Sequence, residues 1–597
     1  METPPPEPNT TVAQLIYRKL LDRRWEWLVF AVLSALVLVF IVRGFPLAWA
    51  INLHAYTGYY FCLVLMGLLA FTAWPVVRSL DPGRFVRQRW RGLLCVLAAS
   101  VFVHLFQPHI MRVFNDEPGH QIVAKVMHLE RENSVPEVGY ALKGGIEYGE
   151  RSLNYRMYFY PFLVSVLHDL TGFRMSNGLV LNGLIGAALF LFVYLGGNRI
   201  YSEGGGVLAV LLLLGLPLLD ETVPSYGHDI TNLTWLAGFF LVLSLYAERR
   251  SPARLNLLVV TGLCVGYSRN ESALYLLLAA LVFGLFLVRD RKVNLTRIVA
   301  LSPVFMLPIL SARSIFKEVM VDLPATFPHL TDDSFFALEY IPANLIRVGQ
   351  WMFDFSTTIP SSPVLVFLGV AGLLALLTSI LLKIFAGKPI VRNDWVLLLF
   401  ALGVIGAFTF ITLSLFWNPV AGEAVRFLLP IHLLFVYAGV WLFANTKEPK
   451  RMFPLAITGM ALVLFFVSIP TKMREVRGDN LSFAKYADWG INWVKQNDNR
   501  NTLYVSQLHT LFLLNDYPAM DLNRAGAHIE DVMQLLAEGY YSEVIVFIIE
   551  QYDAPTDSWA PSRPALPLAA NVRTEVVDER RWAYNQRARF LRVTGYN

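Results

Sequence analysis

Short clusters of ionisable residues interrupt a chain that is otherwise strongly apolar. Each cluster lies at the end of a long apolar run, and the main members are Asp116, Glu117 and His120, then His228 and Asp229, then Arg269 and Glu271, then Glu423 and Arg426. Ionisable side chains are costly at membrane level, so their presence there indicates function. A carboxylate can take a proton from a hydroxyl group, and arginine suits a phosphate leaving group. The clusters therefore favour group transfer from a lipid phosphate over ion conduction.

Each cluster also has a purely structural interpretation. Asp116 and Asp229 are good N-cap residues for the helices expected after them. Arg269 and Glu271 would pair with each other inside a tight hairpin, and Arg426 would reach the lipid headgroups by snorkelling. A cap needs only one acid, however, and capping does not explain why the acids and arginines gather on one predicted side of the membrane.

The composition is that of a membrane protein. Of 597 residues, 55% are hydrophobic and 16% are charged, and the mean hydropathy is +0.48. A soluble domain has shorter apolar runs and more charge. The net charge of +5 does not indicate nucleic-acid binding, because the basic residues lie in short loops between apolar runs. The three cysteines lie inside apolar runs, so neither a disulfide framework nor a zinc site is expected.

The apolar runs predict thirteen membrane crossings, since a span needs about 20 apolar residues. They lie at 27–45, 58–77, 92–108, 177–197, 206–219, 232–247, 256–268, 272–288, 297–311, 363–382, 394–417, 426–443 and 453–469. The apolar stretch 157–171 is short, and we interpret it as an interfacial or re-entrant helix that does not cross.

Basic loops set the predicted orientation. Arg18, Lys19, Arg23 and Arg24 precede the first span and place a tail of residues 1–25 in the cytoplasm. Every second loop is then basic, and with thirteen crossings this puts the C-terminus outside. Residues 26–470 are the predicted transmembrane domain. The large outer segments are 109–176, 312–362 and 471–597.

The outer segments contain predicted structure of their own. The sequence GHQIVAKVMHLERE, which includes Lys125, predicts an amphipathic helix lying on the membrane. Residues 471–597 predict a small α/β domain. Its expected helices are 482–496 and 528–539, and its expected strands are 502–505, 543–549 and 590–593.

In their order, these motifs resemble the GT-C superfamily of membrane glycosyltransferases, in particular the branch with the protein O-mannosyltransferases and the bacterial aminoarabinose transferase of lipid A. Asp116-Glu117 matches the acidic pair at the start of the first outer loop, and YFYPFLVSVLHDLTG matches the proline-led interfacial helix. Pro217 and Asp229 match the second acidic motif. GLCVGYSRNESALYLL resembles the family's hairpin, and Arg426-Phe427-Leu428-Leu429-Pro430 its late Arg-Tyr-Leu-Leu-Pro element.

The resemblance covers roughly 92–470 and has departures. Two spans, 27–45 and 58–77, precede the family's usual first one. The paired prolines of the interfacial helix are reduced to Pro161, and the Lys-Pro-Pro element of the aminoarabinose transferase is absent. This absence weakens the expectation of that enzyme's own substrate.

The resemblance implies an inverting transfer of a sugar from a polyprenyl-phosphate or dolichyl-phosphate donor to an acceptor hydroxyl group. It implies a multi-pass protein, most simply of the bacterial plasma membrane, with its C-terminal domain outside. The roles implied are general base and acidic partners for Asp116, Glu117 and Asp229, phosphate binding for Arg426, Arg269 and Lys125, and positioning of the acceptor for His120, His228 and Glu271.

Several points stay open at the level of sequence. The acceptor is a protein, a lipid or a glycan, and a divalent metal is neither required nor excluded by the resemblance. A lipid-linked glycan flippase is an alternative, but it would place acids or lysines in the middle of helices. A non-catalytic protein that binds glycan through its C-terminal domain is a second alternative.

Overall fold

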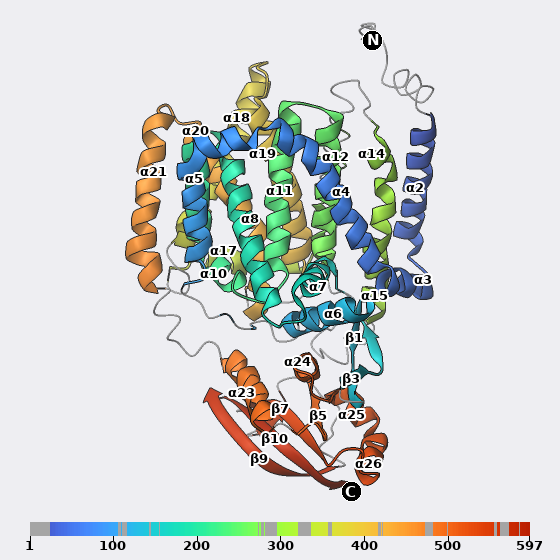
Figure 1. The fold of residues 1–597 in the computed structure, drawn as a ribbon. Coiled ribbons are helices and arrows are strands. Elements are labelled where there is room, and N and C mark those ends of the chain that lie inside the picture. The colour runs from blue at the N-terminus through green and yellow to red at the C-terminus, as the bar shows by residue number, and fades with distance from the viewer. Residues whose placement is uncertain are drawn as a thin grey trace.

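The protein consists of a bundle of long helices and a sheet-containing unit that lies against one end of the bundle (Figure 1). The computed structural model describes residues 24–105, 109, 111, 116–142, 145–154, 156–272, 274–275, 280, 284, 295–319, 336–355, 361–415, 419–420, 422–471, 482–497, 499–553, 558–561, 572–583 and 585–596.

Nine helices within these residues are long and apolar enough to cross a membrane. They confirm an integral membrane protein and coincide with nine of the thirteen predicted crossings. Four are the single helices α2 (Arg24–Arg43), α4 (Gly58–Ser79), α8 (Asn177–Ile200) and α11 (Asp229–Glu248), and a fifth is α18 (Ser361–Phe385). The other four are composite: α14, η3 and α15 (Arg297–Leu301, Ser302–Phe305, Met306–Val319), α19 and η5 (Arg392–Ala407, Phe408–Leu413), η6 and α20 (Gly422–Leu428, Leu429–Ala444), and α21 and η7 (Pro449–Val463, Leu464–Ser468).

The count of thirteen is not confirmed. In α5 (Pro82–Phe102), Arg89 has non-helical φ and ψ of −120° and 19°. The helix first runs along the top of the bundle and then turns down into it (Figure 1). The span expected at 206–219 is the 12-residue α9 (Glu203–Leu214), followed by the short α10 (Pro217–Thr222). α12 (Pro252–Ser268) has 17 residues, and most of 272–288 lies outside the described residues.

The centre of the bundle is formed by helices that are apolar on every side. In α11, 89% of the most apolar window is buried, whereas in α2 the share is 6%. An apolar helix that is not buried by protein must face lipid. Small residues allow the central helices to approach closely: a Cβ on Gly197 of α8 would lie 2.5 Å from the carbonyl oxygen of Gly205 in α9.

Two shorter helices lie at the end of the bundle that faces the sheet. α6 (Asp116–Glu130) lies across this end, and α7 (Phe159–Thr171) packs beside it (Figure 1). With 13 residues, α7 is about 20 Å long and too short to cross. The sequence predicted that α6 is an amphipathic helix lying on the membrane, and this needs a correction. Glu117 to Met127 are all buried, because the helix is covered by the bundle on one side and by the α/β unit on the other.

The α/β unit contains an eight-stranded mixed sheet, with the order β3-β2-β6-β5-β7-β10-β9 and β8 paired to β7. The central strands β6, β5 and β7 are parallel, and the other pairs are antiparallel. The strands are β2 (Val138–Leu142), β3 (Gly145–Tyr148), β5 (Thr502–Ser506), β6 (Ala519–Asp521), β7 (Glu543–Asp553), β8 (Ser558–Pro561), β9 (Val572–Ala583) and β10 (Gln586–Tyr596).

The helices of this unit are α23 (Ser482–Asn497), α24 (His509–Leu514), α25 (Leu522–Ala527) and α26 (Ile529–Ala537). α23, α26, β5, β7 and β10 confirm the predicted C-terminal α/β arrangement. The sheet also extends beyond the predicted domain, because β2 and β3 come from the first outer segment and β2 pairs with β6 through Val138–Met520 and Gly139–Ala519.

Candidate active site

The first turn of α6 places Asp116 between two arginines. Its two carboxylate oxygens accept hydrogen bonds from Arg156, which precedes α7, and from Arg426 in the 3-10 turn η6 before α20. Three segments that are far apart in the sequence therefore meet at one carboxylate. Only 13% of the Asp116 side chain is exposed, so the ion pairs are largely shielded from solvent.

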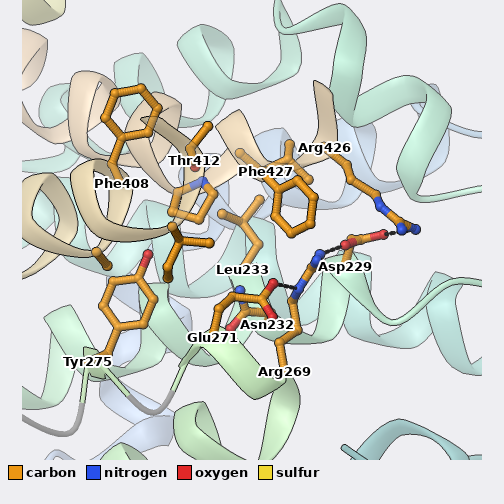
Figure 2. A pocket seen from close by; sticks show the side chains of 14 residues that line it. Asp229, Asn232, Leu233, Arg269, Glu271, Tyr275, Phe408, Thr412, Arg426 and Phe427 are labelled. Carbon is orange, nitrogen blue, oxygen red and sulfur yellow. Dashed lines mark hydrogen bonds and ion pairs between the residues drawn. The ribbon is translucent and has the colours of Figure 1, made fainter. Parts of the chain in front are cut away.

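The ionic contacts continue beyond Asp116. A second guanidinium nitrogen of Arg426 lies 3.6 Å from Asp229, the first residue of α11. Asp229 also pairs with Arg269, and Arg269 pairs with Glu271 (Figure 2). The six side chains form a row of alternating charge, which we call the ionic row: Arg156, Asp116, Arg426, Asp229, Arg269 and Glu271.

A pocket that is partly open to solvent lies beside the ionic row. The charged groups of Asp229, Arg269, Glu271 and Arg426 gather at one side of it, and Phe408, Thr412 and Tyr275 lie at the other (Figure 2). Phe408 and Thr412 belong to the π-helical turn η5, a type of irregularity that is frequent at functional sites. A cavity with arginines among its charged groups at one side and largely apolar residues at the other suits an amphiphile with an anionic head.

The turn before α11 is held by buried polar contacts from two helices. Glu117 accepts a hydrogen bond from the backbone nitrogen of Tyr226 at 3.2 Å, and Gln121 donates to the carbonyl oxygen of Tyr226 at 3.4 Å. Asn182 of α8 donates to the carbonyl oxygens of Ser225 and Gly227 at 2.6 and 2.9 Å. The hydrogen bond from Tyr226 to Glu117 therefore helps to fix the turn that carries Asp229.

Two histidines lie against each other next to the ionic row. His120 follows Asp116 by one turn of α6, and His228 precedes Asp229. Their ring centroids are 4.4 Å apart in an edge-to-face arrangement. Both side chains are buried, with relative exposures of 1% and 7%.

The charges of the row shift the pKa values of the groups beside it. Burial raises the pKa of Asp116, but the charges of Arg156 and Arg426 lower it more, so it lies well below the ordinary value. Burial, together with the arginine charges, lowers the pKa of His120 to about 3 and that of His228 well below its ordinary value. Burial also lowers the pKa of Arg269.

Lys125 is the one predicted site residue that the structure does not bring to the ionic row. Its Nζ donates hydrogen bonds to the carbonyl oxygen of Leu513 at 3.0 Å and to the carboxylate of Asp516 at 2.6 Å. It also lies 4.6 Å from the ring centroid of Phe173. Lys125 thus joins α6 to the α/β unit, at a point where the sequence analysis expected a phosphate contact.

Eight predicted residues are gathered at this site, namely Asp116, Glu117, His120, His228, Asp229, Arg269, Glu271 and Arg426. The side chain of Glu423 lies outside the described residues. Sequence reasoning missed Arg156, 40 residues from its partner Asp116. Its only sequence signal is its place directly before the proline-led interfacial helix, on the predicted outer side.

The donor groups do not fit a divalent metal ion. Within the described ranges, no three His, Cys, Asp or Glu side chains are arranged to hold one. Asp116 and Asp229 share three guanidinium partners, whose positive charges disfavour a cation between the two acids. No step below is routed through a metal.

Residues 157–316 match the family described as dolichyl-phosphate-mannose-protein mannosyltransferase. The matched range contains α7, the turn before α11, Asp229, Arg269 and Glu271. The match confirms the predicted resemblance to GT-C membrane glycosyltransferases and the prediction that the chain is an enzyme of the glycosyltransferase class.

Two solved structures have a similar arrangement of helices. ArnT from Cupriavidus metallidurans, bound to undecaprenyl phosphate, is 14% identical over 83% of this chain and 97% of its own, with a TM-score of 0.48. The oligosaccharyltransferase AglB from Archaeoglobus fulgidus, in complex with an inhibitory peptide and a dolichol-phosphate, is 11% identical over 81% and 75%, with a TM-score of 0.46. No curated protein matches the chain.

Proposed function

We propose that this protein transfers a sugar from a polyprenyl-phosphate donor to an acceptor hydroxyl group at the outer face of the membrane, with inversion at the anomeric carbon. One observation carries the proposal: a row of arginines and carboxylates borders a pocket whose opposite wall is largely apolar. The phosphate would bind among the guanidinium groups, and the first isoprene units would lie against Phe408 and Ile411.

In this proposal, Arg426 and Arg269 hold the donor phosphate and stabilise the charge that develops on it as it leaves. Arg426 can do so only by exchanging part of its contact with Asp116 for the phosphate. This exchange weakens the effect of the Arg426 charge on Asp116. That charge is one of the two arginine charges that lower the basicity of Asp116. Asp116 then takes the proton of the acceptor hydroxyl group, and Asp229 keeps Arg269 in place.

The position of the charges favours transfer over transport. Asp229 begins α11, Arg269 directly follows α12, and Arg426 precedes α20. A proton-coupled transporter or flippase would more often have such groups in the middle of its helices. A non-catalytic glycan-binding protein would not need a row of buried ion pairs at the mouth of an apolar pocket.

The proposal is tested with purified protein in detergent and a polyprenyl-phosphate sugar as the probe. We expect saturable binding and slow release of the polyprenyl phosphate with water as the acceptor, since hydrolysis needs no knowledge of the natural acceptor. Arg426→Ala should bind the donor more weakly and release the polyprenyl phosphate more slowly. The proposal is overturned if the donor does not bind, and movement of the intact donor across proteoliposomes without release of phosphate would favour the flippase.

The proposed sidedness puts the N-terminus in the cytoplasm and the α/β unit outside, because arginines and lysines alternate between loops. Cysteines at Ser558 of β8 and Ser251 before α12 test it, in a variant without Cys62, Cys95 and Cys264. Only the cysteine at position 558 should react with an impermeant reagent added outside. Labelling of both, or of position 251 alone, would contradict the topology and move the site to the other face.

A further inference from the structure

His120 and His228 are buried histidines with unused hydrogen-bonding capacity. They come from different elements, α6 and the turn before α11, yet their rings are 4.4 Å apart. His120 Nε2 and His228 Nδ1 have no hydrogen-bond partner among the described residues, although both atoms are fully shielded. A buried polar atom without a partner costs free energy, so such an arrangement needs an explanation.

The groups that face this pair are mostly cationic. Arg156, Arg269 and Arg426 disfavour a proton on His120, and Asp116 favours one. Arg269 and Arg426 act in the same sense on His228. The ring of Tyr160 packs edge-to-face on His120 at 5.8 Å. Both imidazoles are therefore neutral at neutral pH and have a ring nitrogen ready to accept a proton.

Asp116 is placed to receive the acceptor proton but not to keep it. Arg156 stays paired with it even after Arg426 turns to a phosphate, and a carboxylate beside a guanidinium group is a weak base. His120 lies four residues further along α6, on the same face of the helix. A proton that reaches Asp116 thus has a neutral imidazole as its nearest basic neighbour along the helix.

We propose that the acceptor proton is passed from Asp116 to the His120–His228 pair, which holds it as an imidazolium while the phosphate leaves. This inference rests on the proposed function and adds two catalytic residues to it. The acceptor oxygen forms a bond to the anomeric carbon, and the bond from that carbon to the phosphate oxygen breaks. The electron pair stays on the phosphate, and the proton moves from the acceptor hydroxyl group through Asp116 to the imidazole.

The charges change together in this step. The phosphate goes from one negative charge to two as it leaves, and the histidine pair gains one positive charge. The ionic row consists of three arginines and three carboxylates, so any bound phosphate adds negative charge without a counter-charge of its own. Among the groups described at the site, the imidazoles are the ones able to take up a proton near neutral pH. Binding of the phosphate should therefore be coupled to proton uptake.

The test is calorimetry with a polyprenyl methyl phosphodiester, a probe that has no proton to exchange near neutral pH. Its binding heat is compared in two buffers of different ionisation enthalpy. We expect a fraction of a proton to be taken up per ligand, increasing as the pH falls from about 8 to about 6, because the negative charge of the bound phosphate raises the pKa of the pair toward the ordinary value of histidine. The double variant His120→Asn, His228→Asn should bind the probe without this uptake.

His54→Asn is the matched control. His54 is fully buried beside backbone groups of Asn154 and Arg156, and burial lowers its pKa to about 4. It packs against Tyr158 in a different cluster and lies outside the site. The control should keep the wild-type proton uptake and the wild-type turnover.

Turnover supplies the second readout. Each Asn variant should lower kcat by about 10²-fold with little change in the KM for the donor, since general acid–base assistance is worth about 10²–10⁴. The decrease of kcat at acidic pH should have its midpoint at a higher pH than the corresponding decrease of kcat/KM. Neither decrease should be present in the Asn variants. Binding of the probe without proton uptake, or uptake that persists in the double variant, overturns the relay but leaves the proposed function intact. If the probe does not bind at all, the proposed function itself fails.

Discussion

The two ends of α6 present the same local chemistry in two different settings. At its N-terminal end, Asp116 is paired with Arg156 and Arg426. At its C-terminal end, Asp169 of α7 is paired with Arg131, at 2.7 Å, and with His128, at 2.6 Å. Each is an aspartate with two nitrogen-bearing side chains as partners, so pairing alone does not distinguish a reactive site from a structural contact.

The two clusters differ in what lies next to them. The contacts of Asp169 end within the cluster: the hydroxyl group of Tyr59 donates to it at 3.4 Å, and Arg131 packs over the Tyr59 ring at 4.9 Å. This cluster joins α6, α7 and α4. The contacts of Asp116 instead continue through Arg426 to Asp229 and a pocket. A row of charges that reaches a cavity is the feature that indicates function.

The largest expected effect separates these two aspartates. Asp116→Asn keeps the size of the side chain but removes its charge and basicity, so transfer should fall by about 10²–10⁴-fold. Asp169→Asn should leave kcat within about twofold, because its cluster stabilises helix packing only. Both are measured as release of polyprenyl phosphate from the donor by folded, donor-binding protein.

Thermal unfolding of the two variants is the control for this comparison. If Asp116→Asn retains most of its activity and only lowers stability, then Asp116 is a helix cap, and the base must be sought at Asp229. If Asp169→Asn loses as much activity as Asp116→Asn, the distinction between the two ends of α6 is wrong.

The next effect concerns Arg426, which bridges Asp116 and Asp229. Loss of one charge-assisted hydrogen bond costs about 1.5–3 kcal/mol, so Arg426→Ala should weaken donor binding by about 10- to 100-fold. Arg426→Lys should restore it only in part, because an ammonium group lacks the planar fork of donors. The dissociation constant of a polyprenyl phosphate measures both variants. An unchanged dissociation constant in folded Arg426→Ala would mean that Arg426 only reaches the lipid headgroups and does not bind the donor phosphate.

A smaller effect is expected for Glu117, the sequence neighbour of Asp116. Its carboxylate accepts the backbone hydrogen bond of Tyr226, and a glutamine oxygen can accept the same bond. Glu117→Gln should therefore lower kcat by less than about tenfold, since a hydrogen bond is worth about 1 kcal/mol. Steady-state kinetics of Glu117→Gln and Glu117→Ala compare the two. A loss equal to that of Asp116→Asn would mean that the two acids share the chemistry.

The sequence predicted the elements that depend on local pattern. Long apolar runs predicted nine observed spans, and the short apolar runs at 543–549 and 590–593 predicted β7 and β10. The membership of β2 in the same sheet was not predictable, because its partner β6 is about 380 residues away and has three residues. α9 and α12, with 12 and 17 residues, are shorter than a full span because their apolar runs are short.

The site was predictable where residue type and membrane level coincide. Asp116, Asp229, Arg269 and Arg426 all lie at ends of apolar runs, and the structure brings them together. Arg156 was missed because the apolar run that follows it, 157–171, is short and was not interpreted as a crossing, and its contact with Asp116 depends on how α7 packs beside α6. The partner of Lys125 was missed because it belongs to another domain.

The smallest effect concerns that partner. Lys125 is buried, with 6% of its side chain exposed, whereas Asp516 is 53% exposed. Asp516→Asn leaves a buried ammonium group without its counter-charge, and Lys125→Met removes that group and fills its space with an apolar side chain. Asp516→Asn should therefore weaken docking of the α/β unit more than Lys125→Met does, by roughly 1 kcal/mol. Hydrogen exchange of α24 and α6 measures the docking, and a double-mutant cycle gives the coupling.

Neither variant should change donor binding, since Lys125 lies apart from the ionic row. A tenfold rise in the dissociation constant of the polyprenyl phosphate in Lys125→Met would instead mean that Lys125 binds the phosphate. The role of Lys125 as a contact between α6 and the α/β unit would then not be its main one.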